Sequence, residues 1–301
     1  MQTEIITNAM TVDVEDYFQV AALASAIDES DWDTIKPRVD NNTNRILEIF
    51  EKADIRATFF VLGWVAERHQ GLVRKIVDAG HELACHGFSH KLIYDQSRSE
   101  FAAETARAKN VLEQVSGTPV HGYRAASYSV TDRSLWALDV IAETGFAYDA
   151  SIVPARHDLY GIPGAKVSPY RLELGNGLSL MEFPPSTISI LGHNVSIGGG
   201  GYFRIFPYAF SRWGMRKINE SRKQPFAFYL HPWEIDPEQP RVRTNWKSRF
   251  RHYHNLHRFE PRLRRLLGEF HFGTMRSVVE SGTFETVQIR ELEELTALPG
   301  V

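Results

Sequence analysis

The first two thirds of the chain alternate between strand-like and helix-like stretches, and this alternation restricts the fold more than any other feature. Residues 57–62 form a continuous apolar run of strand length, which is typical of a strand buried on both faces of a parallel sheet. Helical spacing follows over residues 65–79 and ends at Gly80, a common helix terminator. Repeated strand–helix units of this kind predict a parallel α/β fold, either a barrel or an open sheet.

The other expected elements continue this pattern up to a loosely patterned middle region. We expect strands at 9–14, 82–85, 120–123, 146–148 and 225–230, and helices at 43–53, 99–115, 132–144, 208–222 and 261–270. Residues 150–205 are rich in glycine and proline, which predicts long functional or capping loops. Without a repeat or a low-complexity linker, we expect one barrel domain over residues 1–236. A basic, aromatic C-terminal extension over residues 237–301 would pack on it.

Composition excludes several classes of protein. Of 301 residues 43% are hydrophobic, which is enough for a sizeable core and excludes a disordered chain. The 34 Lys and Arg residues are balanced by 37 Asp and Glu residues, which argues against nucleic acid as a partner. The single cysteine, Cys85, excludes an internal disulfide framework and a four-cysteine zinc site. Because there are 12 histidines, a metal site in this chain would use imidazole and carboxylate ligands.

The N-terminal region gives no sign of targeting. Residues 1–10 are polar and lack a basic patch followed by an apolar stretch. No run approaches the roughly 18–20 apolar residues of a membrane span. We therefore expect a cytoplasmic protein without a membrane span, with a mature exported form as the alternative.

An acidic cluster stands at the end of the first expected strand. In the segment from Thr11 to Tyr17, strand alternation puts Asp13 and Glu15 on one face, and Asp16 lies just beyond. Three carboxylates within four residues repel one another, and a cation would relieve that repulsion. The alternative is a solvated acidic strand end.

Two histidines follow another expected strand, in the segment His86-Gly-Phe-Ser-His90. Residues at i and i+4 share a face if the segment is helical, so both imidazoles could reach one ion. Two imidazoles and one carboxylate form a set with open positions that suits Zn, Fe, Co or Ni. Such a pair also arises by chance, but together with the acidic cluster it favours a metal site.

Two further polar residues follow strands. Arg124 could orient Asp13 through a bidentate contact, and a surface ion pair is the alternative. His231 ends an apolar strand and has the chemistry of a general acid, and a capped structural histidine is the alternative.

These four segments, in this order, resemble the polysaccharide deacetylases of carbohydrate esterase family 4, the NodB-like superfamily, over roughly residues 9–235. More narrowly, VDVEDYF, residues 146–152, the loop ending at Arg204 and the basic tail are similar to the deacetylases of exosortase-linked exopolysaccharide loci. The resemblance implies a distorted (β/α)7–8 barrel. It also implies metal-dependent hydrolysis that removes acetyl groups from an N-acetylated polysaccharide or oligosaccharide and releases acetate.

The resemblance also implies roles for individual residues. Asp13 would act as general base held by Arg124, and His231 as general acid. One divalent ion, zinc in the first place with Co, Ni or Fe as alternatives, would be held by His86, His90 and either Glu15 or Asp16. Both carboxylates stay candidates because the family's usual first motif has adjacent aspartates, whereas Val14 follows Asp13 here. Ala126 stands where the family usually has proline, which puts a backbone oxyanion donor over residues 126–128 in question.

Four residues are candidates for contacts with the glycan. Tyr128 and Trp233 could stack on sugar rings, with a place in the core as the alternative. Asp149 and Arg204 could contact sugar hydroxyls, with structural ion pairs as the alternative.

Two rival functions are carried forward. One is a ureide or imide hydrolase of the allantoinase type on the same fold. The other is a non-catalytic glycan-binding module, in which Asp13 and His231 need not converge on a metal. The expected partner is an N-acetylated glycan, and the oligomeric state is left open, a homo-oligomer included.

Overall fold

The computed structural model of the chain describes residues 5–297 and has the expected α/β architecture. Its main sheet has ten strands in the order β10-β1-β2-β3-β4-β5-β7-β6-β12, with β11 also paired to β1. All pairs in this sheet are parallel except β6 with β7, and β8 and β9 form a separate antiparallel hairpin. The strands are β1 (Thr7–Val14), β2 (Thr58–Val61), β3 (Glu82–Cys85), β4 (Gly122–Tyr123), β5 (Tyr148–Asp149), β6 (Tyr170–Glu173), β7 (Ser179–Glu182), β8 (Thr187–Ile190), β9 (His193–Ser196), β10 (Ala227–Leu230), β11 (His271–Gly273) and β12 (Thr286–Gln288).

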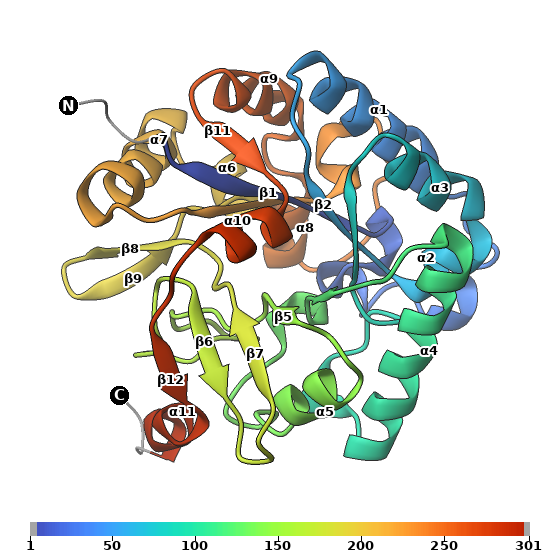
Figure 1. The fold of residues 1–301 in the computed structure, drawn as a ribbon. Coiled ribbons are helices and arrows are strands. Elements are labelled where there is room, and N and C mark those ends of the chain that lie inside the picture. The colour runs from blue at the N-terminus through green and yellow to red at the C-terminus, as the bar shows by residue number, and fades with distance from the viewer. Residues whose placement is uncertain (1–4, 298–301) are drawn as a thin grey trace.

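Helices cover the outside of the curved sheet. Figure 1 shows α1, α3, α2 and α4 along one flank of the molecule, with α6 and α7 near β1 on the other side. The helices are α1 (Val39–Lys52), α2 (Gly63–Arg68), α3 (Gln70–Asp78), α4 (Arg98–Ser116), α5 (Ala137–Glu143), α6 (Gly200–Ile205), α7 (Tyr208–Arg216), α8 (Trp246–Tyr253), α9 (Leu256–Leu267), α10 (Met275–Ser281) and α11 (Ile289–Ala297). None of the helices in residues 5–297 has the length and apolar character needed to cross a membrane.

The apolar run over residues 57–62 forms β2 and is buried on both faces, as its composition predicts. Phe59 belongs to the large apolar core under the helices, whereas Phe60 belongs to a smaller cluster with Ala84 and Tyr148. Asp13 is the register partner of Phe60 on the neighbouring strand. Because side-by-side residues of neighbouring parallel strands point to the same face, Asp13 points to the side of the smaller cluster.

Two expected helices differ from prediction. The helix expected over 65–79 is divided into α2 and α3 at His69, whose backbone leaves the helical region with φ −119° and ψ 47°. The helix expected over 132–144 begins only at Ala137. Before it, the hydroxyl of Ser134 accepts from Thr131 N (2.9 Å) and donates to Ser129 O (2.7 Å). Such local side-chain bonds to the backbone compete with a helical turn.

The region expected to be loops contains regular structure. Residues 150–205 include the strands β6 to β9 and the short helix α6, although long irregular segments remain between them. The helix expected over 261–270 begins at Leu256, so Pro261 lies inside it and not at its first turn.

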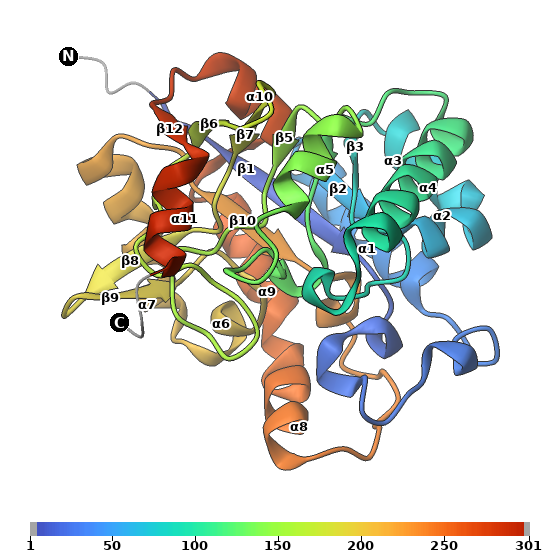
Figure 2. The ribbon, with the colours of Figure 1, turned by 90° about the horizontal axis from the view of Figure 1, so that it is seen from below.

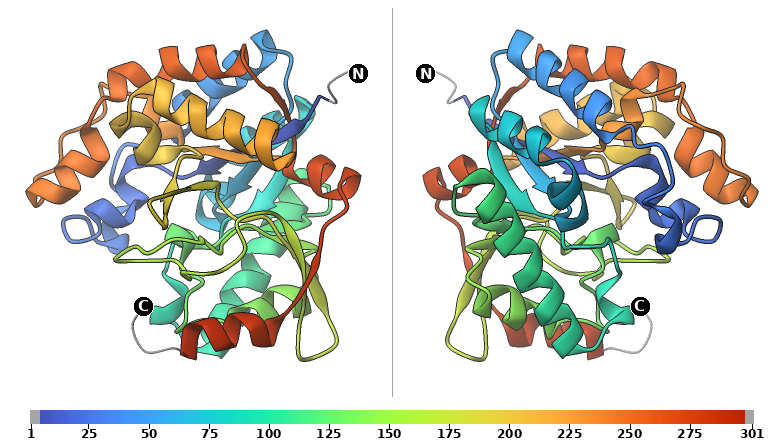
Figure 3. Two further views of the ribbon diagram at one scale, coloured as in Figure 1. Left: turned by 90° about the vertical axis from the view of Figure 1, so that its left-hand side faces the viewer. Right: turned by 90° about the vertical axis from the view of Figure 1, so that its right-hand side faces the viewer.

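Residues after 236 are joined to the main sheet. β11 pairs with β1 and β12 pairs with β6, while α8 contacts the turn Ala21–Leu23 and α9 contacts α6 and the turn Pro232–Ile235. Figure 3 shows α9 and α11 at opposite ends of the molecule. A domain boundary at residue 236 remains a proposal.

Candidate functional site

Polar side chains from four strands of the main sheet meet at its carboxyl edge. Asp13 lies near the end of β1, and His86, Arg124 and His231 directly follow β3, β4 and β10. Because the carboxyl ends of parallel strands lie at one edge, residues that are far apart in sequence come together there.

Glu15, His86 and His90 form a group with the geometry of a metal site. One ligand atom from each residue lies within 4.8 Å of the other two. Glu15 Oε2 lies 2.8 Å from His90 Nε2, yet it is buried and has no hydrogen-bond partner in the described part of the chain. His86 donates from Nδ1 to Arg124 O (2.8 Å), which leaves its Nε2 available to a ligand. This donor set fits a divalent ion such as zinc.

Protonation of these groups is consistent with ion binding. Burial lowers the pKa of His86 to about 4, so the ring is neutral near pH 7. Burial alone would raise the pKa of Glu15, but the adjacent His90, His231 and His86 outweigh it and hold the pKa well below its usual range. A neutral imidazole and an ionised carboxylate are the forms that bind metals.

The two histidines are brought together by a turn and not by a helix, which corrects the helical interpretation. Gly87 and His90 have left-handed φ values of +77° and +56°. The N–H of Gly63, at the start of α2, donates to Gly87 O (2.9 Å). Ser89 donates from both its N–H and its hydroxyl to Glu104 Oε1. These contacts with α2 and α4 fix the turn in a conformation that is unfavourable for a non-glycine residue.

Asp16 does not belong to the metal-binding group. Its carboxylate accepts hydrogen bonds from Tyr17 N (2.8 Å), Arg38 N (2.6 Å) and Val39 N (2.9 Å). It therefore holds the chain after β1 to the start of α1. Of the two carboxylates considered as ligands, only Glu15 points toward the histidines.

Asp13 and Arg124 form a buried ion pair. Arg124 Nη1 donates to Asp13 Oδ1 (2.6 Å) and to Thr11 Oγ1 (2.8 Å), and both charged side chains are at most 2% exposed. The contact uses one guanidinium nitrogen, so it is not the expected bidentate pair. The guanidinium carbon also lies 4.1 Å from the ring centroid of Phe60. These contacts fix the orientation of the Asp13 carboxylate.

His231 faces Asp13 of β1 and Glu15, which directly follows β1, and its other ring nitrogen contacts Glu234. Its Nε2 lies 3.9 Å from Asp13 Oδ2 and 3.7 Å from Glu15 Oε1, and its Nδ1 is 3.1 Å from Glu234 Oε2. Arg204 Nε in turn donates to Glu234 Oε1 (2.7 Å). Burial would lower the pKa of His231, but the bond to Glu234 and the charges of Glu15, Glu234 and Asp13 raise it to about 9.

Trp233 is placed behind the site and not on its surface. Only 6% exposed, its ring is stacked between His231 (5.1 Å) and His252 of α8 (4.2 Å). Its Nε1–H donates to Glu15 Oε1 (3.1 Å). Since both ring faces are occupied, the expectation that Trp233 stacks on a sugar is replaced by an orienting contact with Glu15.

Arg204 and Tyr128 are also buried. Besides Glu234, Arg204 donates to the backbone carbonyls of His252, His254 and Arg251, so its guanidinium is fully engaged in structural contacts. Tyr128 is 7% exposed, and its hydroxyl has no hydrogen-bond partner in residues 5–297. Arg204 therefore follows the structural alternative, whereas the unpaired Tyr128 hydroxyl keeps a role in ligand contact open.

Asp149 lies beside a second buried carboxyl group. Its register partner on β7 is Glu182, and both side chains are fully buried. Asp149 accepts from the Ser151 hydroxyl (2.6 Å), whose oxygen accepts from Ala125 N (2.8 Å), next to Arg124. Burial and the neighbouring Asp149 raise the pKa of Glu182 well above its usual value. Asp149 thus supports the Arg124 loop and is not retained as a contact to sugar hydroxyls.

Sequence reasoning did not identify Glu234 as part of the site. A signal was present, because Pro232 after His231 and a glutamate three residues after the histidine are typical of a helix start with a capping box. That pattern predicts a bond from Glu234 to the backbone of His231, and the structure shows the same carboxylate at the imidazole as well.

Two family matches together span most of the chain. Residues 28–148 match the polysaccharide deacetylase family. The match includes His86, His90 and Arg124, whereas Asp13 and Glu15 precede it. Residues 150–280 match a domain of unknown function, DUF3473, and His231 and Glu234 lie within it.

Curated relatives of this chain are distant and match only in part. The chain is 24% identical over 139 residues to a peptidoglycan deacetylase of Helicobacter pylori, covering 46% of this chain and 43% of that protein. It is 28% identical over 75 residues to a peptidoglycan-N-acetylglucosamine deacetylase of Bacillus cereus, covering 25% and 27%. The matched segments thus span less than half the length of these relatives.

Solved structures share the fold over nearly the whole chain. A putative polysaccharide deacetylase from Mycobacterium smegmatis has a TM-score of 0.61 at 20% identity, covering 93% of this chain and 90% of that one. Puue allantoinase has a TM-score of 0.55 at 14% identity, covering 98% and 92%. The likeness confirms the α/β fold and is shared by enzymes named for different reactions.

Proposed function

We propose that the protein is a metal-dependent hydrolase that removes acetyl groups from an N-acetylated polysaccharide or oligosaccharide and releases acetate. The observation that supports this most directly is that three groups of side chains lie close together at the carboxyl edge of the sheet. His231, which is held by Glu234, lies within 4 Å both of Asp13, the carboxylate held by buried Arg124, and of Glu15, a member of the metal-ligand group.

Glu15, His86 and His90 would hold the ion. An ion bound there supplies polarisation of the acetamide carbonyl and lowers the pKa of a water molecule, to about 7 in well-built zinc sites. Zinc is the first choice for two imidazoles and one carboxylate, with Co, Ni and Fe as alternatives.

Asp13 would accept the proton from the attacking water. A general base must keep its lone pair directed at the reacting water, and the buried contact with Arg124 Nη1 holds the carboxylate for this purpose. The N–H groups of Tyr128 and Ser129 donate to Ala125 and Ala126, so the donor for the developing oxyanion is proposed among the preceding residues, Ala126 or Ser127.

His231 would protonate the departing amine of the sugar. Its Nδ1 is held by Glu234, which leaves Nε2 directed toward Asp13 and Glu15. Glu234 and the Arg204 behind it act as positioning residues, because a carboxylate at one nitrogen of the ring fixes its orientation and favours its protonated form.

The substrate is proposed to be a bacterial glycan. Relatives of this chain are named for peptidoglycan deacetylation. The VDVEDYF segment, the loop ending at Arg204 and the basic tail favour an exopolysaccharide. An allantoinase-type activity is the second candidate, because the fold is shared with Puue allantoinase.

Acetate release tests the proposal. Purified protein should hold about one divalent ion per chain and release acetate from N-acetylated oligosaccharides of chitin, peptidoglycan or exopolysaccharide, and chelation should abolish this activity. His86→Ala should lose both metal and activity, whereas His231→Ala should lose activity and keep the metal. Acetate release that continues after metal removal would contradict the proposal. Turnover of allantoin without acetate release would favour the allantoinase-type activity.

A further inference from the structure

The outer face of α8 forms a hollow that the proposed mechanism does not use. Its volume is about 860 Å³, and its walls come from α8 and the segment before it. Figure 2 shows α8 projecting from the body of the molecule. Three arginines and three aromatic residues line the hollow, namely Arg241, Arg243, Arg249, Trp246, Phe250 and Tyr253.

The arginines of this hollow lack acidic partners. Within the described part of the chain, Arg241, Arg243 and Arg249 form no ion pair, and none of the lining residues is acidic. By contrast, Arg251 of the same helix pairs with Asp158 (3.2 Å), as several other surface arginines of the molecule pair with a nearby carboxylate. The hollow is therefore a local excess of positive charge on a chain with a net charge of −3.

The aromatic residues expose large apolar surfaces to solvent. Trp246 is 73% exposed and Phe250 is 45% exposed, and they are four residues apart on the helix, so they share a face. Beneath them, the Tyr253 hydroxyl accepts from Val242 N (2.9 Å) and donates to Pro240 O (3.2 Å), which fixes the floor. An exposed apolar patch with a charged rim is typical of a binding site.

The opposite face of α8 contacts the proposed active site. His252 stacks on Trp233, which donates to Glu15, and the carbonyl of Arg251 accepts from Arg204. The hollow and the proposed active site thus lie on opposite sides of α8. A polymer long enough to pass the site could also reach the hollow.

We propose that this hollow binds a carboxylate-bearing stretch of the polysaccharide substrate outside the reacting sugar. The inference rests on the proposed function. Aromatic side chains would cover the apolar faces of sugar rings, and arginines would bind their carboxylates, the anion geometry that guanidinium groups match best. The deacetylated product carries amines that arginines repel, so the hollow favours chain that has not yet reacted.

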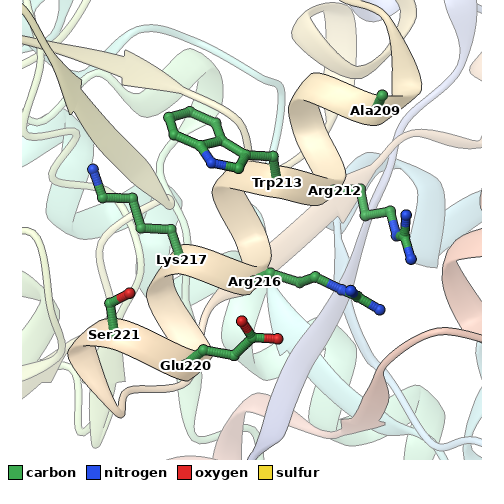
Figure 4. A pocket seen from close by; sticks show the side chains of 7 residues that line it. All are labelled: Ala209, Arg212, Trp213, Arg216, Lys217, Glu220 and Ser221. Carbon is green, nitrogen blue, oxygen red and sulfur yellow. The ribbon is translucent and has the colours of Figure 1, made fainter.

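A hollow on α7 offers a matched control. Figure 4 shows Trp213, Arg216 and Lys217 on one stretch of helix, with Glu220 among them. Trp213 is 49% exposed, and Arg212 of the same surface pairs with Glu269. This surface has an exposed tryptophan and basic residues, but its charge is mixed.

The test compares two oligosaccharides of equal length. Hyaluronan fragments carry carboxylates and N-acetyl groups, whereas chitin fragments carry N-acetyl groups alone. We expect tighter binding of hyaluronan at low salt. Arg243→Gln with Arg249→Gln should weaken that binding about tenfold without affecting chitin fragments, and Trp246→Ala should weaken both. Trp213→Ala with Arg216→Gln should leave both affinities unchanged.

Metal content and urea midpoints identify variants that have lost their fold. The inference is overturned if the α8 variants bind hyaluronan as tightly as the wild type does. It is also overturned if the protein binds duplex DNA or phosphatidylserine vesicles more tightly than hyaluronan. Absence of acetate release from every substrate, together with α8-dependent binding of hyaluronan, would overturn the proposed reaction and keep the binding surface.

Discussion

The hydrogen bond from Trp233 to Glu15 allows a prediction about metal affinity. Trp233 is not a proposed metal ligand, yet it orients one. In Trp233→Phe a smaller aromatic ring stays beside His231 and His252, but the N–H donor to Glu15 Oε1 is removed. Both side chains are buried, so solvent does not easily replace the lost bond.

The size of the effect follows from the charge of the acceptor. A hydrogen bond to a charged group contributes about 1.5–3 kcal/mol. At about 1.4 kcal/mol for each factor of ten, this corresponds to roughly 10- to 150-fold in affinity. Loss of a bond that orients a metal ligand typically costs about 10- to 100-fold. We therefore expect Trp233→Phe to raise the Kd for Zn²⁺ by about 10- to 100-fold.

Competition with a chromophoric chelator at pH 7.5 measures this Kd directly. Trp136→Phe is the control, because the Trp136 N–H donates to Arg133 O (3.2 Å) away from the site. A wild-type Kd in Trp233→Phe, or an equal rise in Trp136→Phe, would refute the reasoning. Urea unfolding of both variants separates a weakened site from a weakened fold.

Three further predictions concern other buried groups. Burial lowers the pKa of His81 to about 4, and the neutral ring accepts a hydrogen bond from Ala57 N. The stability that depends on this neutral form is lost as the pH falls from 6.5 to 4. The free energy of unfolding should fall by up to about 1.4 kcal/mol per pH unit there, and urea titrations of His81→Asn should lack this slope. Asp13→Asn should reduce acetate release by about 100-fold or more. Because it leaves Arg124 buried without a counter-charge, urea unfolding should also show a loss of about 3–5 kcal/mol. Burial raises the pKa of Cys85 to about 12, so iodoacetamide should modify it only after unfolding, and rapid labelling of the folded protein would contradict its burial.

The sequence predicts the order of elements and the strands that end at the site, because apolar periodicity is a local property. It does not distinguish Glu15 from Asp16. That distinction depends on the N–H groups of Arg38 and Val39, which come from a helix whose position only the folded chain defines. The sequence also predicts correctly that His86 and His90 lie close together. It attributes this to a helix, whereas a turn with left-handed residues brings them together.

Burial explains the remaining differences between the predicted and observed sites. Trp233, Arg204 and Asp149 have side chains suited to sugar contacts, and the sequence shows their chemistry but not their surroundings. In the fold, the C-terminal segment covers Trp233 with His252 and surrounds Arg204 with carbonyl groups. Residues far along the chain thus bury side chains that the sequence suggests are exposed, and these side chains orient the site residues instead of contacting a sugar.

The pairing of β1 has a consequence for when the proposed site can assemble during synthesis. β1 leaves the ribosome well before its neighbours β10 and β11, which end only at residues 230 and 273. Translation at about 5–20 residues per second needs roughly 10–50 s to cover that separation. During this interval Asp13 and Glu15 have no His231 beside them, and β1 has an unpaired edge. The proposed site therefore stays incomplete, and this edge of β1 stays accessible to chaperones, until β10 and β11 have been made.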